Sequence, residues 1–176
     1  MENTSTVVIR PAEVSDAKKI SILLKTVYIH TYGIEGVSDE YVNFIEEEFS
    51  IEKISKKIFL ETSIYLVADY KNNLLGVAEI IKNSENPIDC LHYPELSKLY
   101  VLDGFKRKKV GSLLIDETEK ILLKSNLLSY WLCVWALNPA AISFYEKKSF
   151  EIMGKVPFQM ETNCYENLVM TKKLQP

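Results

Sequence analysis

The pattern of apolar and polar positions in the first third of the chain predicts one strand followed by three helices. Val7–Pro11 is a short apolar run that proline ends, as is typical of a strand. Apolar residues then recur at helical spacing as far as Gly33, whose missing side chain suits a helix C-terminus. Ser38 and Ser50 each precede a further run and are typical N-cap residues. The predicted helices cover about 16–32, 39–48 and 51–59.

Alternation with a period of two in the middle of the chain predicts a β-hairpin. Ser63–Tyr70 and Leu74–Ile81 carry alternating apolar and β-branched residues on either side of a polar turn. A polar loop over 82–94 is expected to follow, so that Glu95 begins the next strand. The run over 130–135 is apolar on both faces and is expected to be a central strand. The other predicted strands cover 95–102, 150–158 and 165–171.

Two further helices are predicted in the second half of the chain. The first begins at Val110 and carries an apolar face. The second follows Asn138-Pro139, an N-cap residue and a proline at the first helical position, and is expected over 140–148. This order of strands and helices is typical of an α/β fold, in which helices cover the faces of one sheet. The apolar face of the first of these helices is expected to contain Val110, Leu113, Leu114, Ile121 and Leu122.

A basic loop joins the strand over 95–102 to the helix that begins at Val110. It contains four consecutive cations, Lys106-Arg107-Lys108-Lys109. A loop that brings cations and free backbone N–H groups to a helix N-terminus favours an anion such as phosphate or pyrophosphate. The competing interpretation is a solvated lysine run, because basic turns are common on protein surfaces.

The composition predicts one domain over residues 1–176 and limits the classes of partner. At 176 residues and 47% hydrophobic content the chain is long enough for a full core. A net charge of −3 argues against nucleic acid as the main partner. The sequence has no run of 18 apolar residues. Its N-terminus lacks the basic and apolar regions of a signal peptide. We therefore expect a cytoplasmic protein with no membrane partner.

The cysteines predict neither a disulfide framework nor a metal site. Cys90, Cys133 and Cys164 are odd in number and have no C-x-x-C spacing, which suits a reducing compartment. Cys133 lies in an apolar run and is expected to be a small core residue. Cys90, His92 and His30 are not expected to bind zinc, because such sites usually need three or four organised ligands.

The residues around the basic loop resemble the acetyl-CoA signature of the GNAT superfamily of N-acetyltransferases. Leu99-Tyr100-Val101-Leu102 is similar to the end of the family's signature strand. Val110-Gly111-Ser112-Leu113-Leu114 is similar to the loop exit and helix that follow it. The stretch Trp135-x-x-Asn138-x-x-Ala141-x-x-Phe144-Tyr145-x-x-x-x-Phe150 is similar to a later conserved block of the family. The resemblance therefore extends over nearly the whole chain.

Three positions depart from the family's pattern. Lys106 stands where glutamine or arginine is usual, and Lys109 and Ser149 stand where glycine is usual. If the backbone at Lys109 is left-handed, a lysine there costs about 1 kcal/mol relative to glycine. Two outcomes are open: this cost weakens cofactor binding about fivefold, or the added positive charge offsets it.

The resemblance also implies a fold and an activity. The expected α/β fold is a mixed, mostly antiparallel sheet of about seven strands with helices on both faces, splayed at the central strands. Within the superfamily, Tyr28-x-x-Thr31-Tyr32 and the acidic helices after it are similar to PaiA-like spermidine/spermine N-acetyltransferases. The implied reaction is transfer from acetyl-CoA to a small-molecule amine such as spermidine or spermine, without a metal. The edge strands after Phe150 resemble strands that pair across a homodimer, and the sequence leaves the oligomeric state open.

The sequence also leaves the acceptor and the existence of turnover open. A protein N-terminus or an antibiotic amine is an alternative acceptor. A regulatory module that binds acyl-CoA without turnover is an alternative of another class, because Lys109 and Ser149 occupy usual glycine positions.

Site residues are implied by the resemblance, each with a structural alternative. Tyr145 is expected to be the general acid, and the alternative is a tyrosine that only packs its ring in the core. Glu95 is expected to be the general base, directly or through water, and the alternative is a solvated residue at a strand entry. The run Glu46-Glu47-Glu48 is expected to attract a cationic acceptor or to be a solvated helix face. The acceptor is expected to contact Tyr28, Thr31, Tyr32 and Glu35, and the cofactor Leu99, Tyr100, Val101, Lys106, Arg107, Lys108, Lys109, Val110, Gly111, Ser112, Asn138, Ala141, Tyr145 and Lys147.

Overall fold

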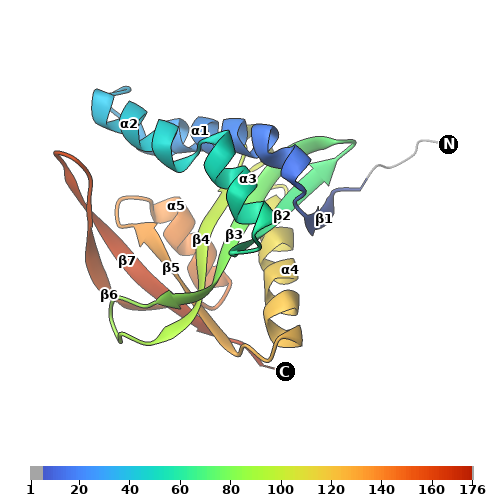
Figure 1. Ribbon diagram of the computed structural model, residues 1–176. Coiled ribbons are helices and arrows are strands. Elements are labelled where there is room, and N and C mark those ends of the chain that lie inside the picture. Colours follow the sequence, from blue (N-terminus) through green and yellow to red (C-terminus); the bar gives the residue numbers. More distant parts are fainter. Residues whose placement is uncertain (1–5, 176) are drawn as a thin grey trace. The chain divides into compact units, whose positions relative to one another are not determined.

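The computed structural model describes residues 6–175, and its strands form a seven-stranded sheet in the order β1-β2-β3-β4-β5-β7-β6 (Figure 1). β4 pairs with β5 in parallel, whereas β5 with β7, β6 with β7 and β1 with β2 pair antiparallel. The prediction of a mixed, mostly antiparallel sheet is therefore confirmed. The strands are β1 (Val8–Pro11), β2 (Ser63–Tyr70), β3 (Asn73–Glu85), β4 (His92–Val101), β5 (Ser129–Trp135), β6 (Glu151–Gln159) and β7 (Cys164–Lys173). The α-helices are α1 (Ala17–Tyr32), α2 (Asp39–Glu48), α3 (Ile51–Phe59), α4 (Val110–Lys124) and α5 (Pro139–Lys147).

The chain divides into two compact units. The first unit contains the described residues up to Glu79 together with Lys98–Thr118. It holds β1, β2, α1, α2 and α3, with the start of β3, the end of β4 and the first part of α4. The second unit contains Ile80–Ser97 and the described residues from Glu119 onward, with β5, α5, β6 and β7. One domain over residues 1–176 stays a prediction.

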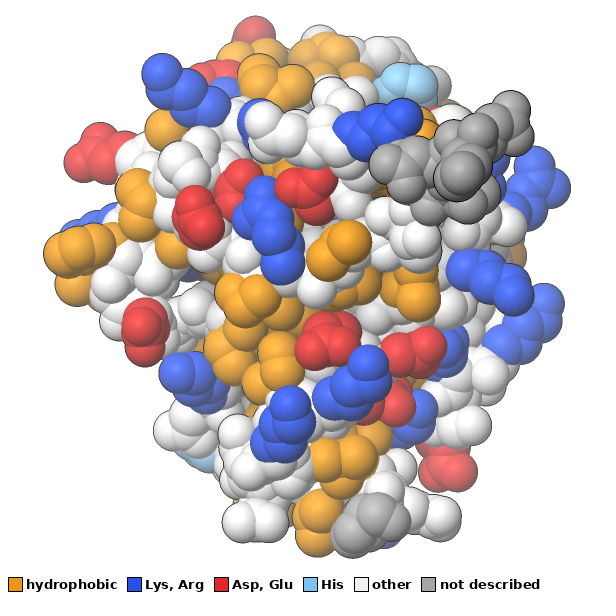
Figure 2. All heavy atoms as spheres, turned by 90° about the vertical axis from the view of Figure 1, so that its right-hand side faces the viewer, with side chains coloured by type: hydrophobic (Ala, Val, Ile, Leu, Met, Phe, Trp, Pro, Cys, Tyr) orange, Lys and Arg blue, Asp and Glu red, His pale blue; other side chains and the backbone are white. Residues whose placement is uncertain are grey.

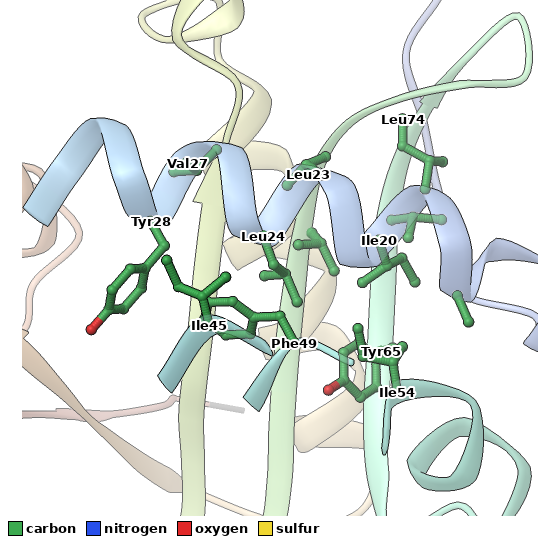
Figure 3. Packing of buried hydrophobic residues seen from close by; sticks show 13 residues of the cluster. Ile20, Leu23, Leu24, Val27, Tyr28, Ile45, Phe49, Ile54, Tyr65 and Leu74 are labelled. Atoms are coloured by element: carbon green, nitrogen blue, oxygen red, sulfur yellow. The ribbon is translucent and has the colours of Figure 1, made fainter. Parts of the chain in front are cut away.

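The core of the first unit forms where α1 lies across the strands (Figure 3). Leu24 of α1 points toward Phe49, and Ile20 and Val27 of the same helix belong to the same buried cluster, as the helical spacing of the sequence predicts. Gly76 of β3 allows a close approach of neighbouring elements. A β-carbon at Gly76 would lie 3.0 Å from the Tyr100 carbonyl oxygen and 3.2 Å from a Leu114 methyl group.

Several helix starts predicted from capping residues are confirmed. The Ser38 hydroxyl accepts a hydrogen bond from the Tyr41 N–H at the start of α2. The Ser50 hydroxyl accepts one from the Lys53 N–H at the start of α3. Each cap satisfies a backbone donor that the helix itself leaves without a partner.

The prediction of a long polar loop over 82–94 is wrong. β3 continues to Glu85 and β4 begins at His92, so the connection is much shorter. Asn86 closes it, because its N–H donates to the Leu91 carbonyl at 2.8 Å and its side-chain oxygen accepts from the Ile88 N–H at 2.8 Å. Polar side chains suggested a loop, but backbone pairing along an antiparallel hairpin does not require apolar side chains.

Some placements within the sheet and on α4 also differ from the prediction. Cys133 is exposed on β5 and is not a core residue. On α4, Leu113 is 39% exposed and Thr118 is fully buried, so the apolar face is rotated from the predicted one. Of the two strands after Phe150, β7 lies between β5 and β6, so β6 alone of this pair is an edge strand.

On the face in Figure 2, basic, acidic and hydrophobic side chains are intermixed over much of the surface, and several Lys and Arg side chains gather at the right-hand edge. Among residues 6–175, no helix is long and apolar enough to cross a membrane. The same residues contain no cluster of three His, Cys, Asp or Glu side chains that could hold a metal ion.

Candidate active site

The basic loop enters α4 through two residues with left-handed backbone. A short 3-10 turn, Asp103–Phe105, follows β4. Arg107 has φ of 60° and Lys109 has φ of 64°, and Lys109 immediately precedes α4. Alternation of left-handed residues with ordinary ones turns successive N–H groups toward the same side, which favours an anion. Together with the 15-residue helix that follows, the loop has the local geometry of an anion site.

The loop cations have different surroundings. The Lys106 ammonium lies 2.6 Å from the Asp103 carboxylate, and the Lys108 ammonium lies 5.2 Å from the centre of the Phe105 ring. Arg107 and Lys109 are exposed on the left-handed turns. The arrangement therefore places positive charge at the helix N-terminus from several side chains.

Lys109 and Ser149 both have the left-handed backbone that glycine adopts most easily, with φ of 64° and 66°. Replacing either by glycine removes steric strain between the β-carbon and the backbone. We expect Lys109→Gly and Ser149→Gly each to raise the free energy of unfolding by about 1 kcal/mol, measured by urea denaturation. Lys56→Gly, inside α3, is the control and should lower it by about 1 kcal/mol. Equal losses in all three variants would contradict strain at the left-handed positions.

The predicted acceptor residues lie in the first unit, where Tyr28 and Tyr32 pack together. Their ring centres are 4.4 Å apart, and Tyr28 is buried in the core cluster. Tyr32 forms a hydrogen bond with Tyr100; burial raises the pKa of Tyr32 and this bond opposes the rise. This hydrogen bond connects Tyr32, a predicted acceptor residue, with Tyr100 of the predicted cofactor strand. The ring of Tyr28, in contrast, belongs to the core. Thr31 is half-buried and Glu35 is exposed.

A small hollow lies beside the end of the predicted cofactor strand in the first unit. Its volume is about 30 Å³, and it is lined by Thr26, Val27, His30, Val101 and Asp103. This hollow could not be predicted from the sequence, because its lining comes from α1, β4 and the turn after β4. Among these residues only Val101 belongs to the predicted site.

The acidic run of α2 is only partly available to a cationic acceptor. Glu46 pairs with Lys25 at 2.7 Å. Glu48 pairs with Lys98 at 3.0 Å and also with Lys53. The interpretation of the whole run as acceptor-binding carboxylates is therefore too broad, because the chain's own lysines bind two of its members. Among the acidic residues around α2, Glu35, Asp39 and Glu47 are exposed.

A buried charge network, which sequence reasoning missed, lies next to the predicted cofactor strand. Glu79 of β3 is fully buried and binds Lys98 of β4 at 2.6 Å and Lys57 of α3 at 2.8 Å. Burial opposes the charged form of Glu79, but the two lysines outweigh it and lower its pKa to about 2. Burial and the charge of Glu79 raise the pKa of Tyr65. The signal in the sequence was a lone acid in the apolar strand 74–80.

Tyr145 lies on α5 in the second unit and its ring is buried among aromatic side chains. The ring centre is 5.3 Å from that of Phe144 and 5.5 Å from that of Phe150. The predicted packing alternative therefore describes the ring correctly, and it leaves the role of the hydroxyl as a prediction. At the start of α5 the Asn138 side-chain oxygen accepts a hydrogen bond from the Ala141 N–H at 3.1 Å, so the predicted cap is confirmed. Lys147 is exposed at the end of α5.

Glu95 lies within β4 in the second unit, not at the entry to the strand. Its side chain is half-buried, and the Ser84 hydroxyl donates a hydrogen bond to it at 2.7 Å. Its backbone pairs with Trp131 of β5. Although the Cys133 side chain is exposed at the surface, the protein atoms around it remove part of the hydration of its thiol; this desolvation, with a contribution from the charge of Glu95, raises the pKa of the thiol to about 11. The alternative of a solvated strand-entry residue is therefore wrong, and Ser84 is a partner of Glu95 that the sequence did not indicate.

Comparison with known proteins identifies the family. A family model described as the acetyltransferase (GNAT) family matches residues 32–150. The match covers more than half of the chain, so the chain belongs to this family. The resemblance seen in the sequence is confirmed, and the protein is an N-acetyltransferase.

Relatives agree with this assignment. The chain is 30% identical to spermidine N(1)-acetyltransferase of Thermoplasma acidophilum over 152 residues, which are 82% of this chain and 88% of that protein. The crystal structure of PaiA N-acetyltransferase from Thermoplasma acidophilum in complex with coenzyme A has a TM-score of 0.77 and 26% identity, covering 96% of this chain and 99% of that chain. Ribosomal-protein-alanine N-acetyltransferase from Brucella melitensis shares the fold, with a TM-score of 0.70 and 19% identity over 95% of this chain and 99% of that chain.

Proposed function

We propose that this N-acetyltransferase moves an acetyl group from acetyl-CoA to the primary amine of a small molecule, with spermidine or spermine as the first candidate acceptor. The observation that carries the proposal is the basic loop with left-handed Arg107 and Lys109 at the start of α4. A relative named as a spermidine acetyltransferase and a related structure that holds coenzyme A support it.

The loop residues fit the phosphates of coenzyme A. Backbone N–H groups at the first turn of α4 donate to phosphate oxygens, and the cations from Lys106 to Lys109 balance their charge. Glycine at position 111 adds no side chain to this turn. Acetyl-CoA, when bound, supplies the activated thioester. We assign its polar contacts to Leu99, Tyr100, Val101, Ser112, Asn138 and Lys147.

In this proposal Glu95 and Tyr145 move the protons. Glu95 accepts a proton from the acceptor ammonium, directly or through water, because an amine with a pKa of about 10 is mostly protonated at neutral pH. The neutral nitrogen then attacks the thioester carbonyl carbon, and a C–N bond forms as the C–S bond breaks. A backbone N–H of Leu99–Val101 donates to the developing oxyanion. The Tyr145 hydroxyl gives its proton to the leaving thiolate, and the second proton that the attacking nitrogen loses on becoming an amide returns Tyr145 to its neutral form through solvent.

The remaining free acids favour a cationic acceptor. Glu35, Asp39 and Glu47 are exposed and carry negative charge near the predicted acceptor residues Tyr28 and Tyr32 in sequence. Exposed charges attract a polycation weakly and are screened by salt. The preference for spermidine over an uncharged amine should therefore be moderate and should decrease with ionic strength.

The test is acetyl-CoA consumption, read as free thiol, with spermidine, spermine, an uncharged amine of similar length and a peptide N-terminus. We expect kcat/KM for a polyamine to exceed that for the uncharged amine by about tenfold at low salt, because about 1.4 kcal/mol is within reach of a few exposed ion pairs. Best turnover of the peptide would identify a protein acceptor instead. Coenzyme A binding by calorimetry without turnover of any amine would support the regulatory module.

A further inference from the structure

Glu48 connects the C-terminal end of α2 to strand β4 within the first unit. Its carboxylate binds the Lys98 ammonium at 3.0 Å and also pairs with Lys53 of α3. Lys98 is 8% exposed and also binds the buried Glu79 of β3. Burial opposes the charged form of Glu48, but Lys98 and Lys53 outweigh it and lower its pKa, so Glu48 is ionised at neutral pH. Because the pair Glu48–Lys98 is largely shielded from water, salt screens it much less than an exposed pair.

The position of Glu48 is unfavourable for the local stability of α2. The helix ends at Glu48, and the run Glu46-Glu47-Glu48 lies in its last turn, which contains no basic residue. Negative charge at this end of a helix meets the negative end of the helix dipole and is destabilising. Local helix stability therefore does not explain an acid at this position, whereas the contact with Lys98 does.

Helix α2 buries little of its own surface. Of its ten residues, Glu40 and Ile45 are buried. Tyr41 and Phe44 are partly buried, and their ring centres lie 6.2 Å and 5.1 Å from that of Tyr28, a predicted acceptor residue on α1. An element with few buried residues opens locally at a low cost in free energy. The ion pairs at the end of α2 therefore have a large share in holding the helix in place.

We infer that Glu48 is a positioning residue for the acceptor amine, which holds α2 beside strand β4 through Lys98. This inference rests on the proposed function. Lys98 is followed directly by Leu99–Val101, whose backbone is assigned to acetyl-CoA, and α2 carries the exposed acids Asp39 and Glu47. The ion pair thus fixes the acidic helix relative to the cofactor strand. Its loss should weaken acceptor binding more than cofactor binding, because β4 keeps its neighbours in the sheet.

The first test measures kcat and KM for spermidine with Glu48→Gln and, as a charge-matched control, Glu46→Gln. Both variants remove one negative charge from the same turn, but Glu46 is 67% exposed and pairs with Lys25 of α1. We expect Glu48→Gln to raise the KM for spermidine about fivefold in both about 0.1 M and about 1 M salt, with kcat and the KM for acetyl-CoA little changed. The effect of Glu46→Gln should be confined to the lower salt concentration, because exposed charges are screened at about 1 M. Equal effects of the two variants at high salt, or a loss confined to kcat, would overturn the inference.

A second measurement is independent of turnover and separates this inference from the proposed function. Hydrogen exchange of backbone amides, read by mass spectrometry without substrate, should be about fivefold faster over 39–48 in Glu48→Gln than in wild type, and unchanged over 110–118 of α4. Faster exchange in α2 of a chain that does not turn over spermidine would retain the role of Glu48 in holding α2 and reject the proposed acceptor. Unchanged exchange in α2, or an equal acceleration over 110–118, would overturn the inference even in an active enzyme.

Discussion

Lys98→Met is expected to lower the free energy of unfolding by about 3 kcal/mol, because it leaves a fully buried carboxylate with half of its charge partners. Glu79 is 0% exposed and Lys98 is 8% exposed, so neither charge is compensated by water. Lys57 still binds Glu79 in the variant, which places the loss toward the lower end of the range for a broken buried pair. Denaturation in urea, monitored by tryptophan fluorescence, measures this change.

Two controls separate the buried network from ordinary ion pairs. Lys155→Met removes an exposed pair, since Lys155 and Glu166 are 61% and 52% exposed, and it should change stability by less than about 0.5 kcal/mol. The double variant Lys98→Met, Glu79→Gln removes both charges and should be more stable than Lys98→Met alone, because no unpaired carboxylate remains buried. If Lys98→Met and Lys155→Met have the same effect, the buried network makes no special contribution.

The network also shows why helix α2 is less available to an acceptor than the sequence indicated. Glu48 belongs to the acidic run, but it joins Lys98 of β4 and Lys53 of α3. A sequence shows charges along the chain, whereas the pairing of these charges depends on elements that meet only after folding. The sequence shows correctly that the run Glu46-Glu47-Glu48 is charged. It does not show that two of these three carboxylates bind lysines of the same chain.

The parts of the fold that sequence predicted best depend on local signals. Ser38, Ser50 and Asn138 satisfy backbone donors within three residues, so the starts of their helices follow from nearby sequence alone. The apolar spacing of α1 likewise predicted its buried face. These features need no information about distant segments.

The errors occurred where tertiary pairing overrides side-chain polarity. Residues 82–85 read as a loop because they are polar, yet they extend β3. Cys133 read as core because its neighbours are apolar, yet its side chain is exposed. Local sequence also does not determine which strands pair, so the position of β7 between β5 and β6 was not predicted.

The candidate site was predicted mainly from family resemblance, and local physics explains only part of it. The suspicion that Lys109 occupies a position of left-handed backbone is confirmed by its φ of 64°. Ser84 and Glu79 could not be singled out, because a lone serine and a lone glutamate have many structural roles. The 2.7 Å contact of Ser84 with Glu95 and the contacts of Glu79 with Lys57 and Lys98 form only in the folded chain.

Tyr145→Phe is expected to lower kcat by about 100-fold to 1000-fold, which is the usual contribution of a general acid. The substitution removes one oxygen and keeps the ring that packs against Phe144 and Phe150. Binding of coenzyme A should therefore change little, and the loss should appear in kcat and in kcat/KM alike. Single-turnover measurements with saturating acetyl-CoA test this, since they report the chemical step separately from product release.

Tyr130→Phe is the matched control for the same aromatic cluster. The Tyr130 ring centre lies 5.0 Å from that of Phe150, and its hydroxyl donates to Glu119 at 2.7 Å. Removing that hydroxyl should cost about 1 kcal/mol of stability and leave the rate of acetyl transfer nearly unchanged. A large loss of kcat in Tyr145→Phe alone would assign the proton transfer to the Tyr145 hydroxyl. If kcat of Tyr145→Phe stays as close to the wild-type value as kcat of Tyr130→Phe does, the Tyr145 hydroxyl takes no part in the reaction and only the buried ring contributes.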